Sequence, residues 1–459
     1  MLDILERCID ACSHPEHLLQ ARGQRRQVIA CTVKNNVVQQ FSTLSAQGVG
    51  VRARVDNGCW GFSSVNTCEA SQVEHAAREA AALSKAASQV SQDHVEFEPQ
   101  KAVTDTVSAP VKVSPSGSAE EIVDIPLRAC KSALEAGSEI KDCKVTYISM
   151  EDHKYFASSE GSQITQHTTR IMLFVNVVAR RNGIVCPCSD NVGYTGGWEI
   201  FNETPPEELG ETVAEKAVHL LVARTPPSGM FRVIIDPTLC ATLLHEAIGH
   251  PMEADLAMAG GGFGTQLNRP VCSELVTIYD DGHIPGGLGF FFYDDEGTPC
   301  TRTTLIEQGV LKSFMHDRES ASASGGLPTG NAHAWDYSVE PLIRQTNIGI
   351  EPGEYTVEEM VEDVSHGLFL EGTFGGQADS NADFTFGFQS AHAIEKGELT
   401  EEFRGANVAG NAIEVFRTID AVSDTPVLRP GACGKYQFAI QGRVVPAIRC
   451  RIMVGGSGG

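Results

Sequence analysis

The sequence lacks any long hydrophobic run. Across its 459 residues, no stretch approaches the roughly eighteen apolar residues that a membrane-spanning helix needs. Residues 1–20 contain several charges and the pair His14–Pro15, without the apolar segment of a secretory signal. Internal repeats and low-complexity segments are absent as well. We therefore expect a cytoplasmic protein that has no membrane span.

Basic residues are scarce relative to acidic ones. The 35 Lys and Arg residues face 59 Asp and Glu residues, and the formal net charge is -24. Nucleic acid and anionic membranes would be repelled by such a chain, so we expect neither as a partner. The 14 cysteines are scattered and accompany no secretory signal, which predicts reduced thiols rather than disulfides.

The chain is too long for one simple core, and two domains are expected. A turn-rich stretch at residues 225–229 marks the boundary, giving domains at 1–227 and 228–459. The fold class predicted is α+β, with an N-terminal α/β-sheet domain and a C-terminal strand-rich, β-barrel-like domain. The 45 glycines fit many strands and tight turns.

The expected elements follow from periodicity and from turn and capping residues. Residues 88–118 contain three prolines and predict a long loop, and Asp56–Asn57–Gly58 predicts a hairpin turn. Pro126 should kink the helix that Ser118 begins or mark its true start. Helices are expected at 2–12, 76–87, 118–136, 205–222 and 356–366, and strands at 27–33, 37–44, 49–55, 60–63, 144–149, 171–179 and 231–235.

One segment carries most of the functional information. It reads His245-Glu246-Ala-Ile-Gly-His250, and it lies on a helix for which Asp236 and Pro237 provide the N-terminal signal. Two histidines and a glutamate directly after the first are the groups with which zinc hydrolases hold the metal and activate water. In an ideal helix, positions five apart point about 140° away from each other, so both rings could not reach one ion.

A local distortion would repair this spacing. Gly249 relaxes the backbone and Pro251 cannot donate to the carbonyl of Ala247, so a one-residue π-bulge between His245 and Pro251 is predicted. A buried, hydrogen-bonded pair of core histidines is the competing interpretation. A regular α-helix here would argue against a shared metal.

A zinc hydrolase needs a third protein ligand. The candidates are Glu253 and Asp255, which follow the motif closely, Cys433, which stands between glycine-rich neighbours far downstream, and more distant histidines. A thiolate is a strong zinc ligand, and Glu253 could share a face with Glu246. The residues alone leave the choice between Cys433 and Glu253 open.

The motif segment resembles the signature of the TldD/PmbA family of metallopeptidases, specifically its TldD side. His245–His250 followed by Glu253-Ala-Asp255 carries this resemblance. Further matching stretches run along nearly the whole chain: Gly48–Arg54, Trp60–Phe62, Asp280–Gly282, Asp294–Pro299, Leu305–Lys312, Met315, Asp317–Arg318, Pro328–Asn331, Phe374–Gln377, Gly405–Asn407, Gly410–Asn411 and Cys433–Lys435. The chain departs from the commoner pattern at Pro251.

The resemblance implies a zinc peptidase with His245, His250 and Cys433 as metal ligands and Glu246 as general base. It also implies action on flexible, partly unfolded peptides inside a closed dimer, formed with a second copy or with a PmbA/TldE-like subunit. Strand edges in the second domain would bind such a peptide through its main chain.

Other residues are candidates for substrate contacts. His316, His333 and Tyr337 are candidates for stabilising the oxyanion, and packing or surface roles are the commoner alternative for each. Phe374, Gly375 and Gly376 are expected to line the substrate cleft or a tight strand corner. No lysine followed by serine or threonine stands at the spacing of a phosphate-binding loop, so that interpretation is rejected.

Two other functions compete with the peptidase. A non-catalytic partner subunit would keep the histidine motif without using it. A regulator of DNA topology, a label attached to the resembled family, is disfavoured by the net charge of -24.

Overall fold

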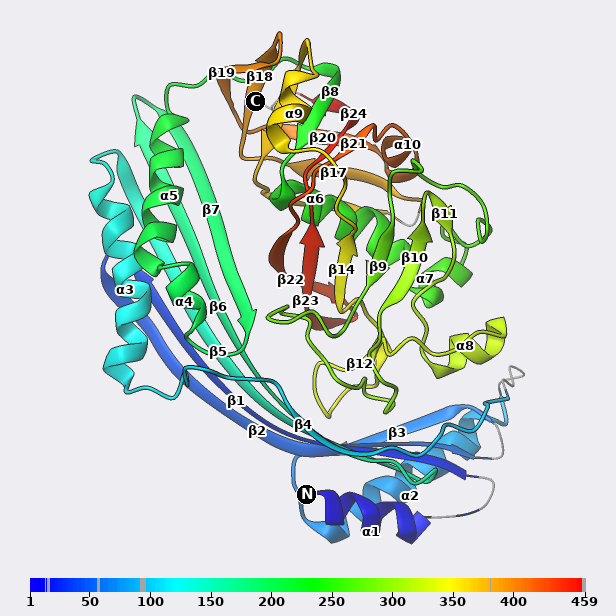
Figure 1. The fold of residues 1–459 in the computed structure, drawn as a ribbon. Helices are drawn as coiled ribbons and strands as arrows, with labels where there is room; N and C mark the ends of the chain where they lie inside the picture. The colour runs from blue at the N-terminus through cyan, green and yellow to red at the C-terminus, as the bar shows by residue number, and fades with distance from the viewer. Residues whose placement is uncertain (13, 15–16, 56–57, 91–95, 380, 456–459) are drawn as a thin grey trace.

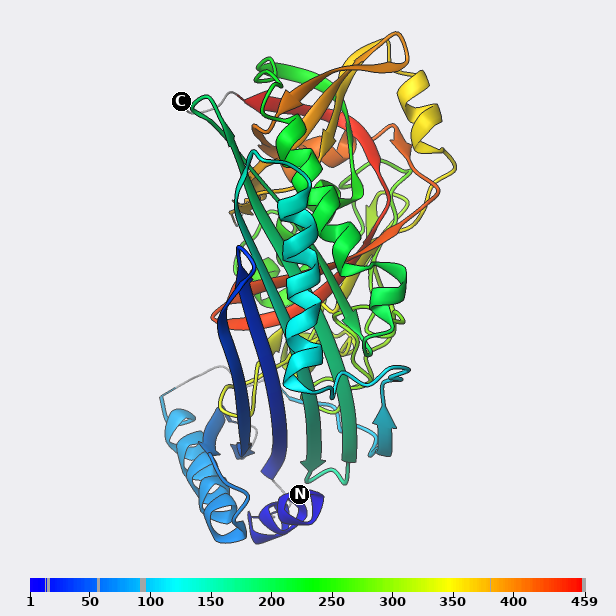
Figure 2. The ribbon, with the colours of Figure 1, turned by 90° about the vertical axis from the view of Figure 1, so that its left-hand side faces the viewer.

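A computed structural model describes residues 1–12, 14, 17–55, 58–90, 96–379 and 381–455. Its main feature is one long, curved sheet whose concave side holds the strand-rich C-terminal part (Figure 1). Two pairs of helices lie on the opposite, convex side, one pair toward each end of the sheet (Figures 1 and 2). None of the helices in the described part of the chain is both long and apolar enough to span a membrane.

Seven strands form the curved sheet. Their spatial order is β3-β2-β1-β5-β6-β4, and β7 also pairs with β6. The bounds are β1 His17–Lys34, β2 Val37–Val55, β3 Trp60–Val65, β4 Thr104–Ser108, β5 Ile140–Ser158, β6 Gln163–Arg181 and β7 Ile184–Thr195. The predicted strand segments of this region lie in β1, β2, β3, β5 and β6, but the two predicted at 37–44 and 49–55 are one strand, β2, and β7 was not predicted. Strands β1, β2, β5 and β6 extend well beyond the apolar runs. Their extra residues mix polar side chains with isolated apolar ones such as Leu19 and Ala157, which are buried under α1 and α2, so no continuous apolar run marks them in the sequence.

The predicted β2–β3 hairpin is confirmed by the pairing of Arg54 with Trp60. Asp56 and Asn57, on which the turn prediction rested, lie outside the described residues. The predicted loop at 88–118 is wrong in part, because β4 pairs in parallel with β6 along Thr104–Ser108. This edge strand has few apolar side chains, so its pattern is too weak to read from the sequence.

The convex face carries both helix pairs. Helices α3 (Ala119–Glu135) and α5 (Pro206–His219) cover one end, with α4 (Ile200–Glu203) beside them, and α1 (Leu2–Cys12) and α2 (Ala70–Ala87) cover the other. Ser118 and Glu121 make the predicted capping box of α3. The α3 helix starts at Ala119 and continues through Pro126, so that proline does not mark its start.

The C-terminal part contains two larger sheets with helices between and around them. In the described chain neither sheet closes on itself, so this region is strand-rich but is not a closed barrel. The first sheet runs β16 (Gly375–Ala378), β17 (Asp383–Gly387), β20 (Asn407–Asn411), β24 (Ile448–Gly455), β8 (Gly229–Ile235), β15 (His366–Glu371), β18 (Ser390–Glu395) and β19 (Glu398–Arg404), with β21 (Ala421–Val422) beside β24.

The second sheet of this region, and the remaining short elements, complete the fold. Its order is β11 (Val310–Leu311), β10 (Thr303–Glu307), β9 (Ile278–Asp280), β14 (Asn347–Ile350), β23 (Gln437–Val445) and β22 (Val427–Lys435). The other elements are the β12–β13 pair (Ala332–His333 and Leu342–Ile343) and helices α6 (Pro237–Leu244), α7 (Ala254–Met258), α8 (Arg318–Ser324), α9 (Val357–Glu362) and α10 (Ala412–Arg417). Residues of α6 belong to one core cluster with residues from both sheets, so α6 is held rigidly between them.

Buried ion pairs connect the curved sheet and its turns to the C-terminal part of the chain. Lys154 on β5 lies 2.8 Å from Asp295, and Arg318 lies 2.6 Å from Glu160. Arg22 is a further cation at 3.8 Å from Asp295. Burial alone raises the pKa of Asp295, but Lys154, Arg22 and His333 outweigh it and hold that pKa at about 2.

Acidification should therefore weaken this connection. Because the folded pKa of Asp295 lies below the ordinary value of 3.8, its carboxylate stabilises the fold above that value. The stabilisation, about 2 kcal/mol, is lost as the pH falls from about 4 to about 2. Asp295→Asn should lower the thermal midpoint of unfolding at pH 6. The difference in this midpoint between the variant and the wild type should shrink as the pH falls from about 4 to about 2.

The control is Asp142→Asn, which breaks a largely exposed pair with Lys34. It should change stability by less than about 1 kcal/mol. If the thermal midpoints of the wild type and Asp295→Asn differ by the same amount from pH 6 to pH 2, the Asp295 carboxylate does not provide this stabilisation.

Candidate metal centre

The histidine motif sits where a helix changes its winding. Asp236 accepts a hydrogen bond from the N–H of Leu239 and starts α6 as predicted. The α-helix ends at Leu244, a π-helical turn spans His245–Gly249, and a 3₁₀ turn spans His250–Met252. The N–H of His250 donates to the carbonyl of His245, five residues back. The predicted distortion is confirmed, and it places the two imidazole centroids 4.6 Å apart.

Gly249 serves this turn in a different way from the one expected. Its φ is -60°, an ordinary helical value, so its backbone freedom is not used. A Cβ at this position would instead lie 2.2 Å from Oε1 of Gln345. The glycine is needed because it lets the Gln345 amide approach the helix.

Three metal-binding side chains meet at this turn. Ligand atoms of His245, His250 and Cys433 lie within 4.8 Å of one another. Cys433 comes from β22, which pairs with β23 and is thereby brought to the helix. Two imidazoles and a thiol are ligands that suit zinc and other borderline or soft cations, and they do not suit Mg²⁺ or Ca²⁺.

His245 is held as a neutral ring. It is fully buried, and its Nδ1 lies 2.8 Å from Oε1 of Gln345. Burial lowers the pKa of His245 well below its ordinary value, and the nearby charge of Arg443 lowers it further. Because Gln345 Oε1 accepts the Nδ1 proton, the lone pair is on Nε2, where it accepts a hydrogen bond from the Gln441 amide nitrogen at 2.9 Å, a bond that a metal ion would replace.

His250 is oriented by a carboxylate behind it. Its Nδ1 lies 3.1 Å from Oε1 of Glu253, and Oε2 of that fully buried carboxylate lies 2.5 Å from Nζ of Lys435. Burial lowers the pKa of His250, but hydrogen bonds to Cys433 and Glu253 raise it to about 9. Glu253 thus supports His250 from outside the three-ligand cluster.

A cleft opens beside the cluster. It has a volume of about 360 Å³, and Glu246 and His250 line it together with Pro251, Gly434 and Lys435. Glu246 is 26% exposed, and its Oε1 lies 3.7 Å from Nε2 of His245. The motif carboxylate therefore faces both the cluster and the space that a ligand would occupy.

The other candidate residues lie at varying distances from this cleft. Phe374 precedes edge strand β16, and Gly375 and Gly376 begin it. None of the three is among the cleft-lining residues, although Ala378 at the end of this strand is. Asp255 pairs with Lys435 at its rim. His316 is buried against Ser320 and is not among the cleft-lining residues. Tyr337 bonds to Asn66 of the N-terminal domain.

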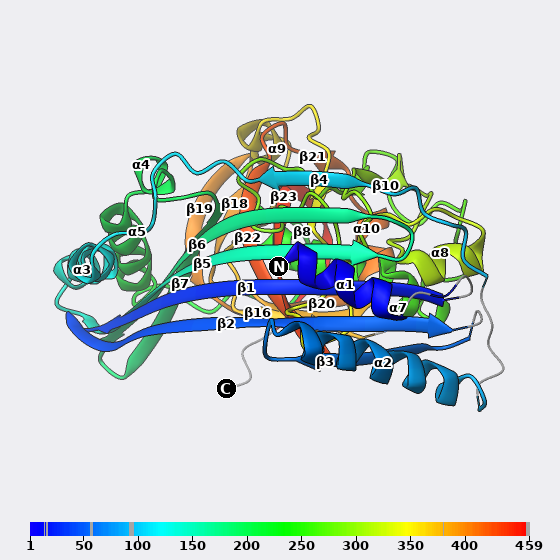
Figure 3. The same ribbon diagram turned by 90° about the horizontal axis from the view of Figure 1, so that it is seen from below.

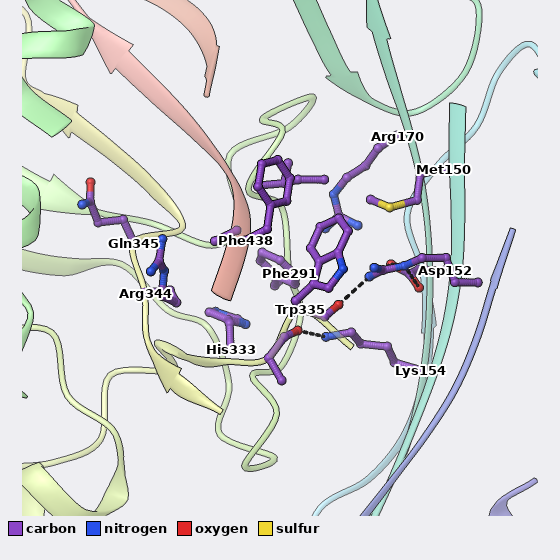
Figure 4. A pocket seen from close by; sticks show the side chains of 14 residues that line it. Met150, Asp152, Lys154, Arg170, Phe291, His333, Trp335, Arg344, Gln345 and Phe438 are labelled. Atoms are coloured by element: carbon purple, nitrogen blue, oxygen red, sulfur yellow. Dashed lines mark hydrogen bonds and ion pairs between the residues drawn. The ribbon is translucent and has the colours of Figure 1, made fainter. Parts of the chain in front are cut away.

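His333 occupies a neighbouring pocket between the curved sheet and the C-terminal part of the chain (Figure 4). Its ring stacks on Phe291 at 4.2 Å, and burial lowers its pKa to about 3. Arg344 and Gln345 line the same pocket, so it adjoins the residues that contact the cluster.

Sequence reasoning missed several of the supporting residues. Gln345 and Gln441 hold His245, and the guanidinium of Arg344 contacts Sγ of Cys433. A signal was present: residues 344–347 are four consecutive polar residues set between aliphatic ones, and all four are buried. Polar side chains in a buried strand need hydrogen-bond partners, so such a run indicates that these residues bond to other buried polar groups.

The fold and the cluster together define a class of protein. It has a candidate metal centre of two histidines and one thiol, beside a distorted helix in a strand-rich region that packs on a long curved sheet. Comparison with known proteins agrees with this class. Three family models match in succession: PmbA/TldA metallopeptidase domain 1 at residues 20–84, the central domain at 114–221 and the C-terminal domain at 228–456.

Individual relatives carry the same description. A metalloprotease of Methanocaldococcus jannaschii is 33% identical over 88% of this chain and 89% of its own length. The zinc metalloprotease TldD homolog of Saccharolobus solfataricus is 30% identical over 66% of this chain and 68% of its own length. The TldE structure from Thermococcus kodakarensis shares the fold, with a TM-score of 0.77, 20% identity and 99% of both chains covered. This chain belongs to the TldD/PmbA metallopeptidase family.

Proposed function

We propose that this protein is a zinc-dependent peptidase in which His245, His250 and Cys433 hold the metal and Glu246 is the general base. The observation that carries the proposal is the meeting of these three ligands beside a cleft that both His250 and Glu246 line. When bound, zinc supplies Lewis acidity and makes water nucleophilic near neutral pH.

The chain's own groups supply the proton transfers. Glu246 accepts the proton of the attacking water and passes it to the leaving amine of the cleaved peptide. Gln345 holds His245 in the tautomer that presents Nε2, and Glu253 holds the ring of His250. Neither supporting residue needs to touch the substrate.

Flexible or unfolded peptides are the proposed substrates. Strand β16 lies at the edge of its sheet and contacts the π-helical turn. An extended peptide could pair with this edge through main-chain hydrogen bonds, which would bring a peptide bond toward Glu246 with little dependence on side chains. A folded substrate would not offer a free strand.

We also propose a dimer, formed with a second copy or with a PmbA/TldE-like subunit, and a cytoplasmic location. The shared fold with TldE supports a related partner. All fourteen cysteines are free, which supports a reducing compartment. Native mass spectrometry of the chain alone and with such a subunit tests the first point, and fractionation tests the second.

Metal removal tests the proposed activity. Treatment with a strong chelator should abolish cleavage of an unstructured peptide, and a stoichiometric addition of Zn²⁺ should restore it. The same peptide locked into a stable fold should remain uncut. Cleavage that survives complete removal of zinc, verified by elemental analysis, would exclude the proposal.

The support of His250 by Glu253 gives a second test. Glu253→Gln should weaken zinc binding at this centre by about 10–100-fold, because a neutral amide orients the ring less well and leaves Lys435 without its buried partner. Competition with a chromophoric chelator measures the effect. Asp255→Asn is the matched control, since Asp255 also pairs with Lys435 but is 39% exposed. Equal losses in both variants would show that the effect comes from Lys435 and not from His250.

A further inference from the structure

A second group of metal-ligating side chains lies on the curved sheet, on residues that the proposed peptidase reaction does not use. Glu151 and His153 belong to β5, and His167 belongs to β6. Their ligand atoms all lie within 4.8 Å of one another. No residue of this group belongs to the centre around His245.

The strand alternation shows which face carries this group. Alternate residues at 143–147 of β5 belong to the core under α3 and α5, and Tyr155 and Ala157 pack with α1 and α2. Side chains two apart share a face, so Glu151 and His153 point to the same convex side. Along β5 they lie between Tyr147, which packs under α3 and α5, and Tyr155, which packs with α1 and α2. Figures 1 and 3 show the two helix pairs toward the two ends of the sheet.

The opposite face serves the domain contact. Asp152 and Lys154 line the pocket between the domains, and Lys154 pairs with Asp295 there. The second group therefore lies across the sheet from the catalytic domain. Its side chains are between 27% and 40% exposed, which leaves room for water beside them.

The geometry of the group is convergent. His153 and His167 are direct cross-strand partners, and their rings stack with centroids 4.1 Å apart. The Nε2 atoms of both rings point to the same oxygen, Oε1 of Glu151, at 3.2 and 3.0 Å. Because a carboxylate oxygen can only accept, the Nε2–H of each ring donates to it in this structure. Oγ of Ser108 lies 3.3 Å from Nδ1 of His167, where it can accept the Nδ1 proton once a metal ion takes the place of the proton on Nε2.

We propose that Glu151, His153 and His167 form a second binding site for a divalent transition metal, of which Zn²⁺ is the representative ion. Two imidazoles and one carboxylate are a ligand set that zinc accepts, with a further position open to water. Imidazole ligands disfavour Mg²⁺ and Ca²⁺. Paired strands are a rigid support, so little movement is needed to bind the ion.

Cobalt(II) titration of the full-length, metal-free protein tests this site. Co²⁺ replaces zinc in such sites, and a thiolate ligand adds a sulfur-to-cobalt charge-transfer absorption that only the Cys433 centre can produce. The wild type should bind two equivalents, one with and one without this absorption. The double variant His153→Gln/His167→Gln should bind one equivalent, with the thiolate absorption retained and peptide cleavage unchanged.

Two further variants sharpen the test. Ser108→Ala should weaken the second equivalent by roughly tenfold, as expected for the loss of an outer hydrogen-bond partner. His75→Gln is the control, because His75 also pairs with a glutamate, at 3.3 Å on helix α2, but no third ligand joins this pair among the residues that the structure describes. It should keep both equivalents. Should the double variant melt at a lower temperature than the metal-free wild type, the single variant His167→Gln replaces it.

The outcomes separate this proposal from the catalytic one. One wild-type equivalent that carries the thiolate absorption, or two equivalents retained in the double variant, would overturn the second site. One equivalent without thiolate absorption, lost in the double variant, would support the second site and count against the centre at Cys433. A hydrogen-bonded surface network that binds no metal corresponds to the first of these results.

Discussion

Replacement of Glu246 by glutamine should lower kcat for peptide cleavage by roughly 10²–10⁴-fold, the usual contribution of a general base. Glutamine has nearly the same shape but cannot accept a proton from water. The side chain lines the cleft and lies next to His245 without being one of the three ligands, so zinc content should stay the same. Steady-state kinetics on an unstructured peptide, together with elemental analysis, measure both quantities.

Glu274→Gln is a suitable control, since Glu274 is an exposed carboxylate of the same domain outside the cleft. It should leave kcat unchanged. If Glu246→Gln keeps full activity with zinc bound, Glu246 is not the base. If it loses zinc along with activity, its role is to hold the metal centre and not to move a proton.

Cys433→Ala should have the second large effect, on metal binding itself. Loss of an outer hydrogen-bond partner alone weakens metal binding by about 10–100-fold, so loss of a ligand should exceed roughly 100-fold. When zinc is limiting, peptide cleavage by the variant should fall in proportion to the fraction of protein that holds zinc. The cobalt-substituted protein should lose its sulfur-to-cobalt absorption, which identifies the centre independently of any other bound ion.

Two comparisons keep this result interpretable. Cys68→Ala removes another partly exposed thiol and should change neither zinc binding nor activity. Cys433→Asp supplies a carboxylate ligand in place of the thiolate and should recover part of the zinc affinity that Cys433→Ala loses. Because Arg344 contacts Cys433, thermal melting of each metal-free variant reports whether the fold is intact. A Cys433→Ala protein that keeps both its zinc affinity and the thiolate absorption would exclude this ligand.

The fold was predictable where local patterns were strong. The capping box at Ser118, the Asp236–Pro237 helix start and the β2–β3 hairpin all rest on residues within a few positions of each other. Strand β4 was missed because an edge strand with alternating polar residues buries too little to show a pattern. The large sheet is curved (Figure 1), and neither of the two larger C-terminal sheets closes on itself. Both features depend on packing between layers, which a local sequence pattern does not predict.

In the candidate site, too, some features follow from local sequence and others from tertiary packing. The distorted turn was predictable from the sequence: two histidines five apart can share a metal only if the helix is distorted, and Pro251, which lacks an N–H, interrupts the regular hydrogen bonding next to the second histidine. The residues also determined the set of donors that a metal could meet.

Tertiary structure alone decided which donors meet. The pairing of β22 with β23 places Cys433 beside both rings, whereas Glu253 turns behind His250 to reach Lys435, although it is far closer in the chain. It also supplied Gln345 and Gln441 as partners of His245. Contacts across a hundred or more residues depend on strand register and on the burial of whole layers, and these arise only when the complete chain has folded.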